Sequence, residues 1–180
     1  MSAGPAPAGR PGRCVVIGVG NDLRHDDGFG PAVVQLLRRE DAAQGAEVTL
    51  AVTDGEPSGL MDLWTGADVA VVVDVVRSPA GPAGHRYELL CDEAAGLTAP
   101  AASSHDVSLG STVELARALG RLPRVLVVLA VAGHDFGYGP GLSPQVASAV
   151  APTARRATEL VTRALEGEFL AQAADDVGRG

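Results

Sequence analysis

Two aspartates and one histidine are the residues of this chain best suited to carry chemistry. Asp74 lies inside the apolar run 69–76, Asp27 in an acidic turn, and His105 in a polar segment farther along the chain. A carboxylate inside a valine-rich run is costly unless it is hydrogen-bonded, paired with a charge or bound to a cation. Two carboxylates and one imidazole would suit a first-row transition metal and leave positions open for water or substrate.

Each of these residues also has a purely structural interpretation. Asp74 could end a strand and accept N–H groups from the neighbouring loop. Asp27 could sit at a helix N-terminus, where the helix dipole would stabilise it by about 0.3–1 kcal/mol. His105 could be a polar surface residue, and the same interpretation applies to the other three histidines: His25, His85 and His134.

Alternating strand and helix patterns predict how these residues are positioned. Apolar runs predict strands at 14–19, 47–52, 69–76, 85–91 and 124–132. Helical spacing predicts helices at 28–40, 57–64, 106–119 and 143–167, the last with Ser143 as N-cap. This order predicts a single three-layer α/β domain: a mostly parallel, twisted sheet of about five strands, flanked by helices, with 85–91 near a sheet edge.

Parallel strands end at one edge of a sheet, and α/β folds bind their ligands beyond that edge. Polar residues that follow or end the expected strands are therefore predicted to gather there: Asn21, Asp27, Asp54, Gly55, Asp74, His105, His134 and Asp135. Residues from distant parts of the sequence would thus share one site.

Composition limits the class of protein. The 180 residues, 46% hydrophobic and 20% charged, are enough for one domain, expected at 14–167 between a disordered tail (1–13) and a polar tail (168–180). The net charge of -8 argues against a nucleic-acid partner or an anionic membrane surface. No apolar stretch approaches a membrane span and no signal peptide precedes the domain, so we expect a cytoplasmic protein.

Several other chemistries are excluded or disfavoured by the sequence. The fourteen basic residues are all arginine, which excludes Schiff-base chemistry and a P-loop. Gly18 and Gly20 begin a dinucleotide-binding motif, with Asp54 as its acid, but Leu23 replaces the third glycine. No G-x-S-x-G motif of a serine hydrolase occurs. Cys14 and Cys91 are interpreted as small buried apolar residues.

The motifs together resemble one family, the nickel-iron hydrogenase maturation proteases. Residues 16–21 (Val-Ile-Gly-Val-Gly-Asn), then Leu23 and residues 26–30 (Asp-Asp-Gly-Phe-Gly), resemble the opening motif of that family. The later fragments follow in the family's order: Asp54-Gly55, residues 73–76, Ser104-His105-Asp106 and residues 141–144. The resemblance covers roughly residues 14–160.

The resemblance implies an endopeptidase that removes a C-terminal extension from the hydrogenase large-subunit precursor after nickel insertion. The family's metal-binding residues match Asp27, Asp74 and His105, and an aspartate that affects activity in the family matches Asp54. We therefore expect Asp27, Asp54 and Asp74 to be catalytic. We expect nickel to be recognised in the substrate rather than held tightly by the enzyme, with the metal or a carboxylate activating water.

Some positions depart from the family pattern, and they bear on which substrate is used. His25 stands where the family usually has glycine, and Glu56-Pro57 replaces the usual Gly-Thr. We expect Asn21, Gly55 and His134 to contact the substrate, and His134 with Asp135 could add ligands. Two alternatives are a precursor-binding chaperone that does not cleave and a nucleotide- or small-molecule-binding α/β protein.

Overall fold

Five strands form one sheet, and its four parallel strands end at the same edge. The computed structural model describes residues 12–40, 47–77, 81–92 and 109–166. Strands β1 (Cys14–Val19), β2 (Val48–Thr53), β3 (Val69–Arg77) and β5 (Val125–Gly133) run parallel, and β4 (Arg86–Asp92) pairs antiparallel with β5. The strand order is β2-β1-β3-β5-β4. The α/β fold, its mostly parallel sheet and the edge position of β4 are confirmed.

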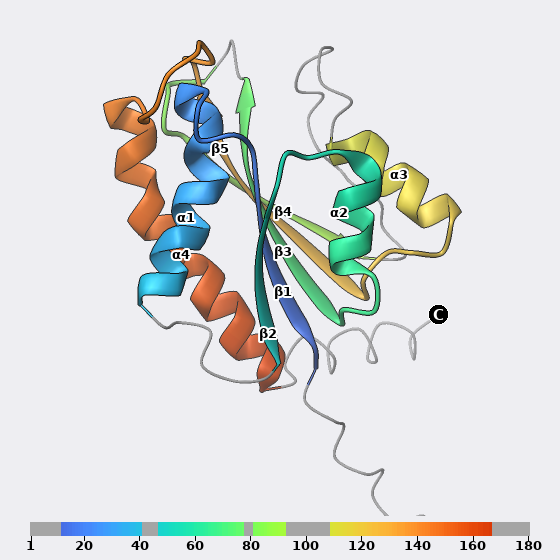
Figure 1. Ribbon diagram of the computed structural model, residues 1–180. Helices are drawn as coiled ribbons and strands as arrows, with labels where there is room; N and C mark the ends of the chain where they lie inside the picture. Colours follow the sequence, from blue (N-terminus) through green and yellow to red (C-terminus); the bar gives the residue numbers. More distant parts are fainter. Residues whose placement is uncertain (1–11, 41–46, 78–80, 93–108, 167–180) are drawn as a thin grey trace, which may run out of the picture.

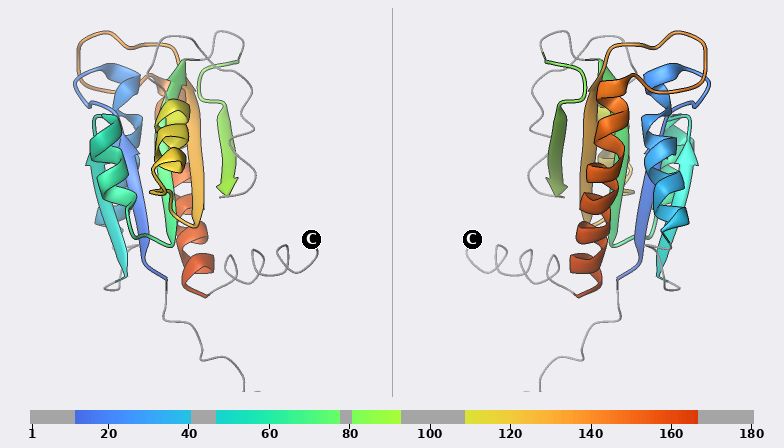
Figure 2. Two further views of the ribbon diagram at one scale, coloured as in Figure 1. Left: turned by 90° about the vertical axis from the view of Figure 1, so that its right-hand side faces the viewer. Right: turned by 90° about the vertical axis from the view of Figure 1, so that its left-hand side faces the viewer.

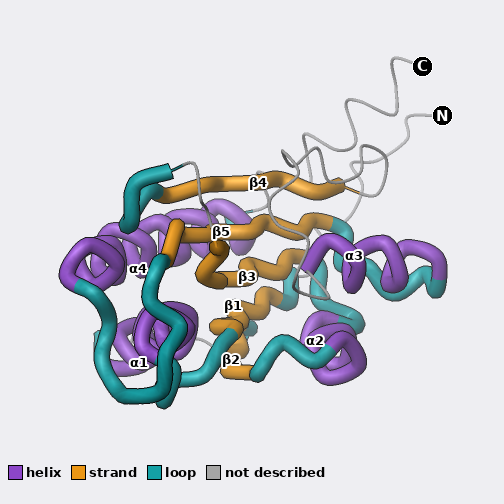
Figure 3. Tube along the Cα trace, turned by 90° about the horizontal axis from the view of Figure 1, so that it is seen from above, coloured by secondary structure: helices purple, strands orange, loops and turns teal. Residues whose placement is uncertain are grey.

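Helices cover both faces of this sheet and make the three predicted layers (Figures 1, 2 and 3). Helices α1 (Phe29–Arg39) and α4 (Pro144–Leu165) pack on one face, and α2 (Pro57–Trp64) and α3 (Leu109–Ala118) on the other. Side chains of a strand alternate between faces, so Val71 and Val73 join the α1/α4 core while Val72 joins the α2/α3 core. Both cores are apolar, as expected for a parallel sheet.

The start of α1 is packed directly on the ends of two strands. A 3-10 turn, η1 (His25–Gly28), leads into the helix, and Gly30 lies in the helix's first turn. A Cβ atom on Gly30 would lie 2.4 Å from the Val19 carbonyl oxygen and 2.7 Å from that of Val73. Glycine therefore allows the loop before α1 to lie close to the ends of β1 and β3.

Helix α4 begins where predicted but is not capped as predicted. Pro144 occupies its first turn and Ser143 the N-cap position, yet the Ser143 side chain makes no capping hydrogen bond. Its Oγ atom is buried without a hydrogen-bond partner, and its backbone N–H instead donates to Asp26 at 2.8 Å. The helix ends at Leu165, short of the predicted residue 167.

Both cysteines are buried, as the sequence indicates, and they do not form a disulfide with each other. Burial and the negative charges of Asp68 and Glu47 raise the pKa of the Cys14 thiol to about 11. Among the described residues, no helix combines the length and the apolar character that crossing a membrane requires. The expected tails lie outside the described residues except for Gly12 and Arg13.

Candidate active site

The carboxyl edge of the sheet contains a point where the strand order reverses. From β1 the chain passes through α1 to β2, and from β2 it returns through α2, on the opposite face, to β3 on the other side of β1. Figure 3 shows these crossings from above. Open α/β sheets bind ligands in the crevice at such a reversal. Asp27 follows β1 and Asp74 lies in β3, so the two predicted carboxylates belong to the two paired strands at this reversal.

Asp27 is held against the end of β1 by the backbone. The N–H of Asn21 donates to the Asp27 carbonyl oxygen at 3.2 Å and to its Oδ2 at 3.0 Å. Gly20 has a φ of 132°, and a Cβ atom there would lie 1.9 Å from the Asp27 carbonyl oxygen. Only glycine permits this approach, which fixes a partly buried carboxylate at the crevice.

Asp74 lies on the α2/α3 face of the sheet, in line with Val72 of the same strand. It pairs in register with Ala130 of β5, which pairs in turn with Tyr87 of β4. Its Oδ1 accepts the N–H of Val75 at 2.7 Å, and this donor is the next residue of the same strand rather than a residue of the neighbouring loop. Asp74 is only partly buried.

The neighbouring aspartate, Asp26, is a site residue that the sequence did not single out. Its side chain is 0% exposed. Oδ2 accepts the backbone N–H groups of His134 and Asp135, both at 3.0 Å, and Oδ1 accepts that of Ser143 at 2.8 Å. Burial alone would raise the pKa of Asp26, but the N–H groups of Asp135, Ser143 and His134 outweigh burial and hold this pKa below its usual value.

Asp26 therefore ties the β5–α4 loop, residues 134–143, to the β1–α1 loop. No local sequence signal could reveal this, since the three donors lie 108, 109 and 117 residues away along the chain. The Asp-Asp pair before a helix marks the position, but which of the two carboxylates is buried depends on the packed loops.

His25 also connects the same two loops through hydrogen bonds. The backbone N–H of His25 donates to the Gly139 carbonyl oxygen at 2.8 Å. The N–H of Gly139 donates in turn to the Leu23 carbonyl oxygen at 2.9 Å. The ring Nδ1 of His25 lies 3.2 Å from the Gly141 carbonyl oxygen. His25 has a φ of 46°, in the left-handed region that favours glycine. The sequence predicted a polar surface residue here, but His25 is partly buried in this contact.

Asp54 and Gly55 lie past the end of β2, beside the same edge. The Asp54 carboxylate is exposed, and its Oδ1 accepts the N–H of Glu56 at 3.1 Å in a turn that leads into α2. Glu56 then caps that helix by accepting the N–H groups of Ser58 and Gly59. Gly55, with a φ of 88°, lies against Val19 at the end of β1. The turn thus borders the crevice next to β1.

The remaining predicted substrate contacts, Asn21 and His134, and the possible extra ligand Asp135 all make contacts within or between loops. Asn21 Oδ1 accepts the N–H of Leu23 at 2.9 Å, which shapes the turn that carries Asp27. His134 is exposed, and its Nε2 lies 3.2 Å from the Gly81 carbonyl oxygen, at the connection between β3 and β4. Asp135 Oδ1 accepts the N–H of Gly137 at 3.1 Å.

His105 lies outside the described residues. Within the described part of the chain, no group of three or more His, Cys, Asp or Glu side chains could hold a metal ion. Asp27 and Asp74 supply carboxylate oxygens, which can accept a proton from water or donate to a cation.

Comparison with known proteins agrees with this architecture. The family model described as hydrogenase maturation protease matches residues 31–160, a range that includes Asp54 and Asp74 and begins just after Asp27. The chain is 30% identical over 153 residues to the hydrogenase expression/formation protein HupD of Thiocapsa roseopersicina, covering 83% of this chain and 67% of that protein. It is 26% identical over 142 residues to the hydrogenase 2 maturation protease of Escherichia coli, covering 78% and 85%.

Solved structures show the same fold. The hydrogenase maturating endopeptidase HybD from Escherichia coli aligns with a TM-score of 0.64 and 24% identity over 81% of this chain and 89% of that one. The [NiFe] hydrogenase maturation protease HybD from Thermococcus kodakarensis aligns with a TM-score of 0.63 and 21% identity over 83% and 99%. The family model matches well over half of the residues of this chain, so this chain belongs to the hydrogenase maturation protease family.

Proposed function

We propose that this chain is an endopeptidase that removes the C-terminal extension of a nickel-iron hydrogenase large-subunit precursor after nickel has been inserted. Family membership supports a maturation protease, and similar proteins carry the names hydrogenase 2 maturation protease and hydrogenase maturating endopeptidase. The observation that supports the proposal is that Asp27 follows β1 and Asp74 lies in β3, the neighbouring strands at which the strand order reverses.

In this proposal nickel belongs to the substrate. Asp27 and Asp74, together with His105, complete the coordination of a nickel ion that the precursor already holds, and so dock the extension across the crevice. Carboxylates and an imidazole are suitable ligands for a first-row transition metal with open positions. A precursor without nickel lacks this central contact, which makes nickel insertion a condition for cleavage.

Cleavage requires a water molecule activated against the scissile carbonyl group. A carboxylate of the crevice takes the proton from water, or the nickel lowers the pKa of the water that it binds. Asp26 does not serve as this base, because its carboxylate is buried and occupied by three backbone N–H groups. Asn21, Gly55 and His134 are proposed to contact the extension beside the crevice.

The proposal is tested by the mass of a nickel-loaded and a nickel-free large-subunit precursor after incubation with this protein. Loss of a C-terminal peptide from the nickel-loaded form alone supports both cleavage and the nickel requirement. Nickel-dependent association without loss of mass would instead identify a chaperone. Absence of both association and cleavage would refute the proposal.

Three variants test the residues. Asp74→Asn is expected to reduce cleavage by at least about 100-fold, the usual contribution of a positioned acid or base; cleavage at the normal rate would refute its role. Asp68→Asn is the matched control, because Asp68 lies at the opposite end of β3 and accepts the Arg13 N–H at 2.9 Å. Asp54→Asn retains the acceptor for the Glu56 N–H, so a loss of activity would show that the negative charge itself is needed.

A further inference from the structure

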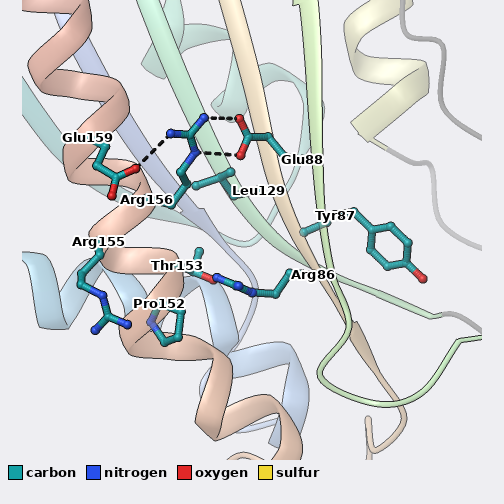
Figure 4. A pocket seen from close by; sticks show the side chains of 10 residues that line it. Arg86, Tyr87, Glu88, Leu129, Pro152, Thr153, Arg155, Arg156 and Glu159 are labelled. Carbon is teal, nitrogen blue, oxygen red and sulfur yellow. Dashed lines mark hydrogen bonds and ion pairs between the residues drawn. The ribbon is translucent and has the colours of Figure 1, made fainter.

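A groove of about 430 Å³ lies between β4 and the middle of α4, away from the crevice (Figure 4). Arg86 and Glu88 of β4 line one side, and Thr153 and Arg156 of α4 line the other. Tyr87, between the two β4 residues, points away from the groove toward the other face of the sheet (Figure 4). Because Tyr87 is in register with Asp74 through Ala130, the groove is on the opposite face from the Asp74 carboxylate.

The arginines of this groove are not equally neutralised. Arg156 binds both carboxylate oxygens of Glu88, at 2.7 and 2.8 Å, and reaches Glu159 at 3.0 Å. Arg86 and Arg155 have no ion pair or hydrogen bond to their guanidinium groups within the described part of the chain. Positive charge is therefore left at one place on a chain whose net charge is -8.

A threonine hydroxyl group lines the groove together with these arginines. Thr153 is only 5% exposed, and no described residue forms a hydrogen bond with its Oγ1. Arg86 of β4 and Thr153 of α4 both line the groove, from its two sides. A carboxylate in the groove could accept hydrogen bonds from both this hydroxyl and a guanidinium.

We propose that this groove is a second binding site, an exosite, which takes one carboxylate group of the hydrogenase precursor; the role of the precursor rests on the proposed function. The three arginines and two glutamates that line the groove leave a single positive charge. That balance fits a monovalent carboxylate better than a phosphate dianion, which Glu88 and Glu159 would repel. The site adds affinity for the precursor without touching the scissile bond.

Direct binding is measured by calorimetry at low salt with two peptide probes. Acetyl-hexaglutamate amide offers only side-chain carboxylates, and acetyl-hexaglycine with a free C-terminus offers only an α-carboxylate. Binding of either probe, weakened about threefold to tenfold by Arg86→Gln and by Arg155→Gln, supports the site and identifies the source of the carboxylate. Binding of neither probe, or equal binding by the variants, overturns it.

Two further variants sharpen this test. Arg124→Gln is the control, because Arg124 is exposed and, among the described residues, likewise has no hydrogen bond or ion pair to its guanidinium. Glu88→Gln removes the main neutralising partner of Arg156 and is expected to tighten binding of the same probe by a similar factor. If Glu88→Gln weakened binding while Arg124→Gln left it unchanged, the electrostatic basis of the site would be wrong.

The role in processing is measured separately with the nickel-loaded precursor. Arg86→Gln is expected to raise KM about threefold to tenfold and to leave kcat unchanged, because the groove contributes binding and not chemistry. An unchanged KM would overturn the exosite. If the unaltered protein does not cleave the precursor, the proposed function fails, while the peptide probes still decide whether the groove binds a carboxylate.

Discussion

Replacement of Asp26 by asparagine is the sharpest test of how the crevice is held together. The Asp26 carboxylate is 0% exposed and accepts three backbone N–H groups from the β5–α4 loop. Asparagine has nearly the same shape but carries only one acceptor oxygen and no charge. The substitution therefore removes electrostatic attraction and an acceptor while leaving little change in volume.

The magnitude follows from these hydrogen bonds. In its best orientation the amide oxygen keeps the N–H groups of His134 and Asp135, and its NH₂ group faces the N–H of Ser143. One charge-assisted bond is lost, at about 1.5–3 kcal/mol, and the other two weaken because their acceptor is neutral. We expect a loss of about 3 kcal/mol, which lowers the Tm of a domain of this size by about 6–12 °C.

Tryptophan fluorescence provides the assay. The chain has one tryptophan, Trp64, which is 0% exposed, so its emission shifts when the core unfolds. Asp22→Asn is the matched control, because Asp22 is an exposed aspartate of the same loop. A Tm for Asp26→Asn within 2 °C of the Asp22→Asn value would refute the argument that Asp26 holds the loops together.

The pH dependence gives a second and independent check. The pKa of Asp26 is lower in the folded state than its ordinary value of about 3.9, so its contribution is complete above that value and is lost as pH falls through the folded-state pKa. The difference in Tm between the unaltered protein and Asp26→Asn is therefore expected at neutral pH and should shrink below about pH 4. A difference that is constant with pH would contradict the assigned role of the charge.

Three other predictions concern Gly20, Gly139 and Cys14. Gly20→Ala places a Cβ atom 1.9 Å from the Asp27 carbonyl oxygen, and we expect loss of cleavage together with a lower Tm. Gly139→Ala, at a φ of 143°, places a Cβ atom 2.7 Å from the His25 ring and should lower the Tm by several degrees; an unchanged Tm would show that the β5–α4 loop shifts freely. Cys14, buried and with a pKa of about 11, should resist iodoacetamide at pH 8 until the protein is unfolded, as mass spectrometry can show.

The sequence by itself determined the layers and most of the element boundaries. The run 69–76 is apolar except for Asp74, and such a run can be buried only between two layers of helices. The alternating run at β4 indicated an edge strand. Helix α2 has the predicted bounds, since Pro57 marks its first turn. The edge at which Asp27 and Asp74 lie also followed from strand order, because parallel strands end on one side.

Only the tertiary structure decided which carboxylate of the pair Asp26-Asp27 is buried and which borders the crevice. The answer depends on N–H groups of a loop more than 100 residues away, and sequence periodicity carries no information about such contacts. The same holds for Ser143, whose N–H binds Asp26 although its residue type predicted a side-chain cap. The groove beside Arg86 could not be predicted from the sequence either. The ion pair of Arg156 with Glu88 joins a helix and a strand that meet only in the folded chain.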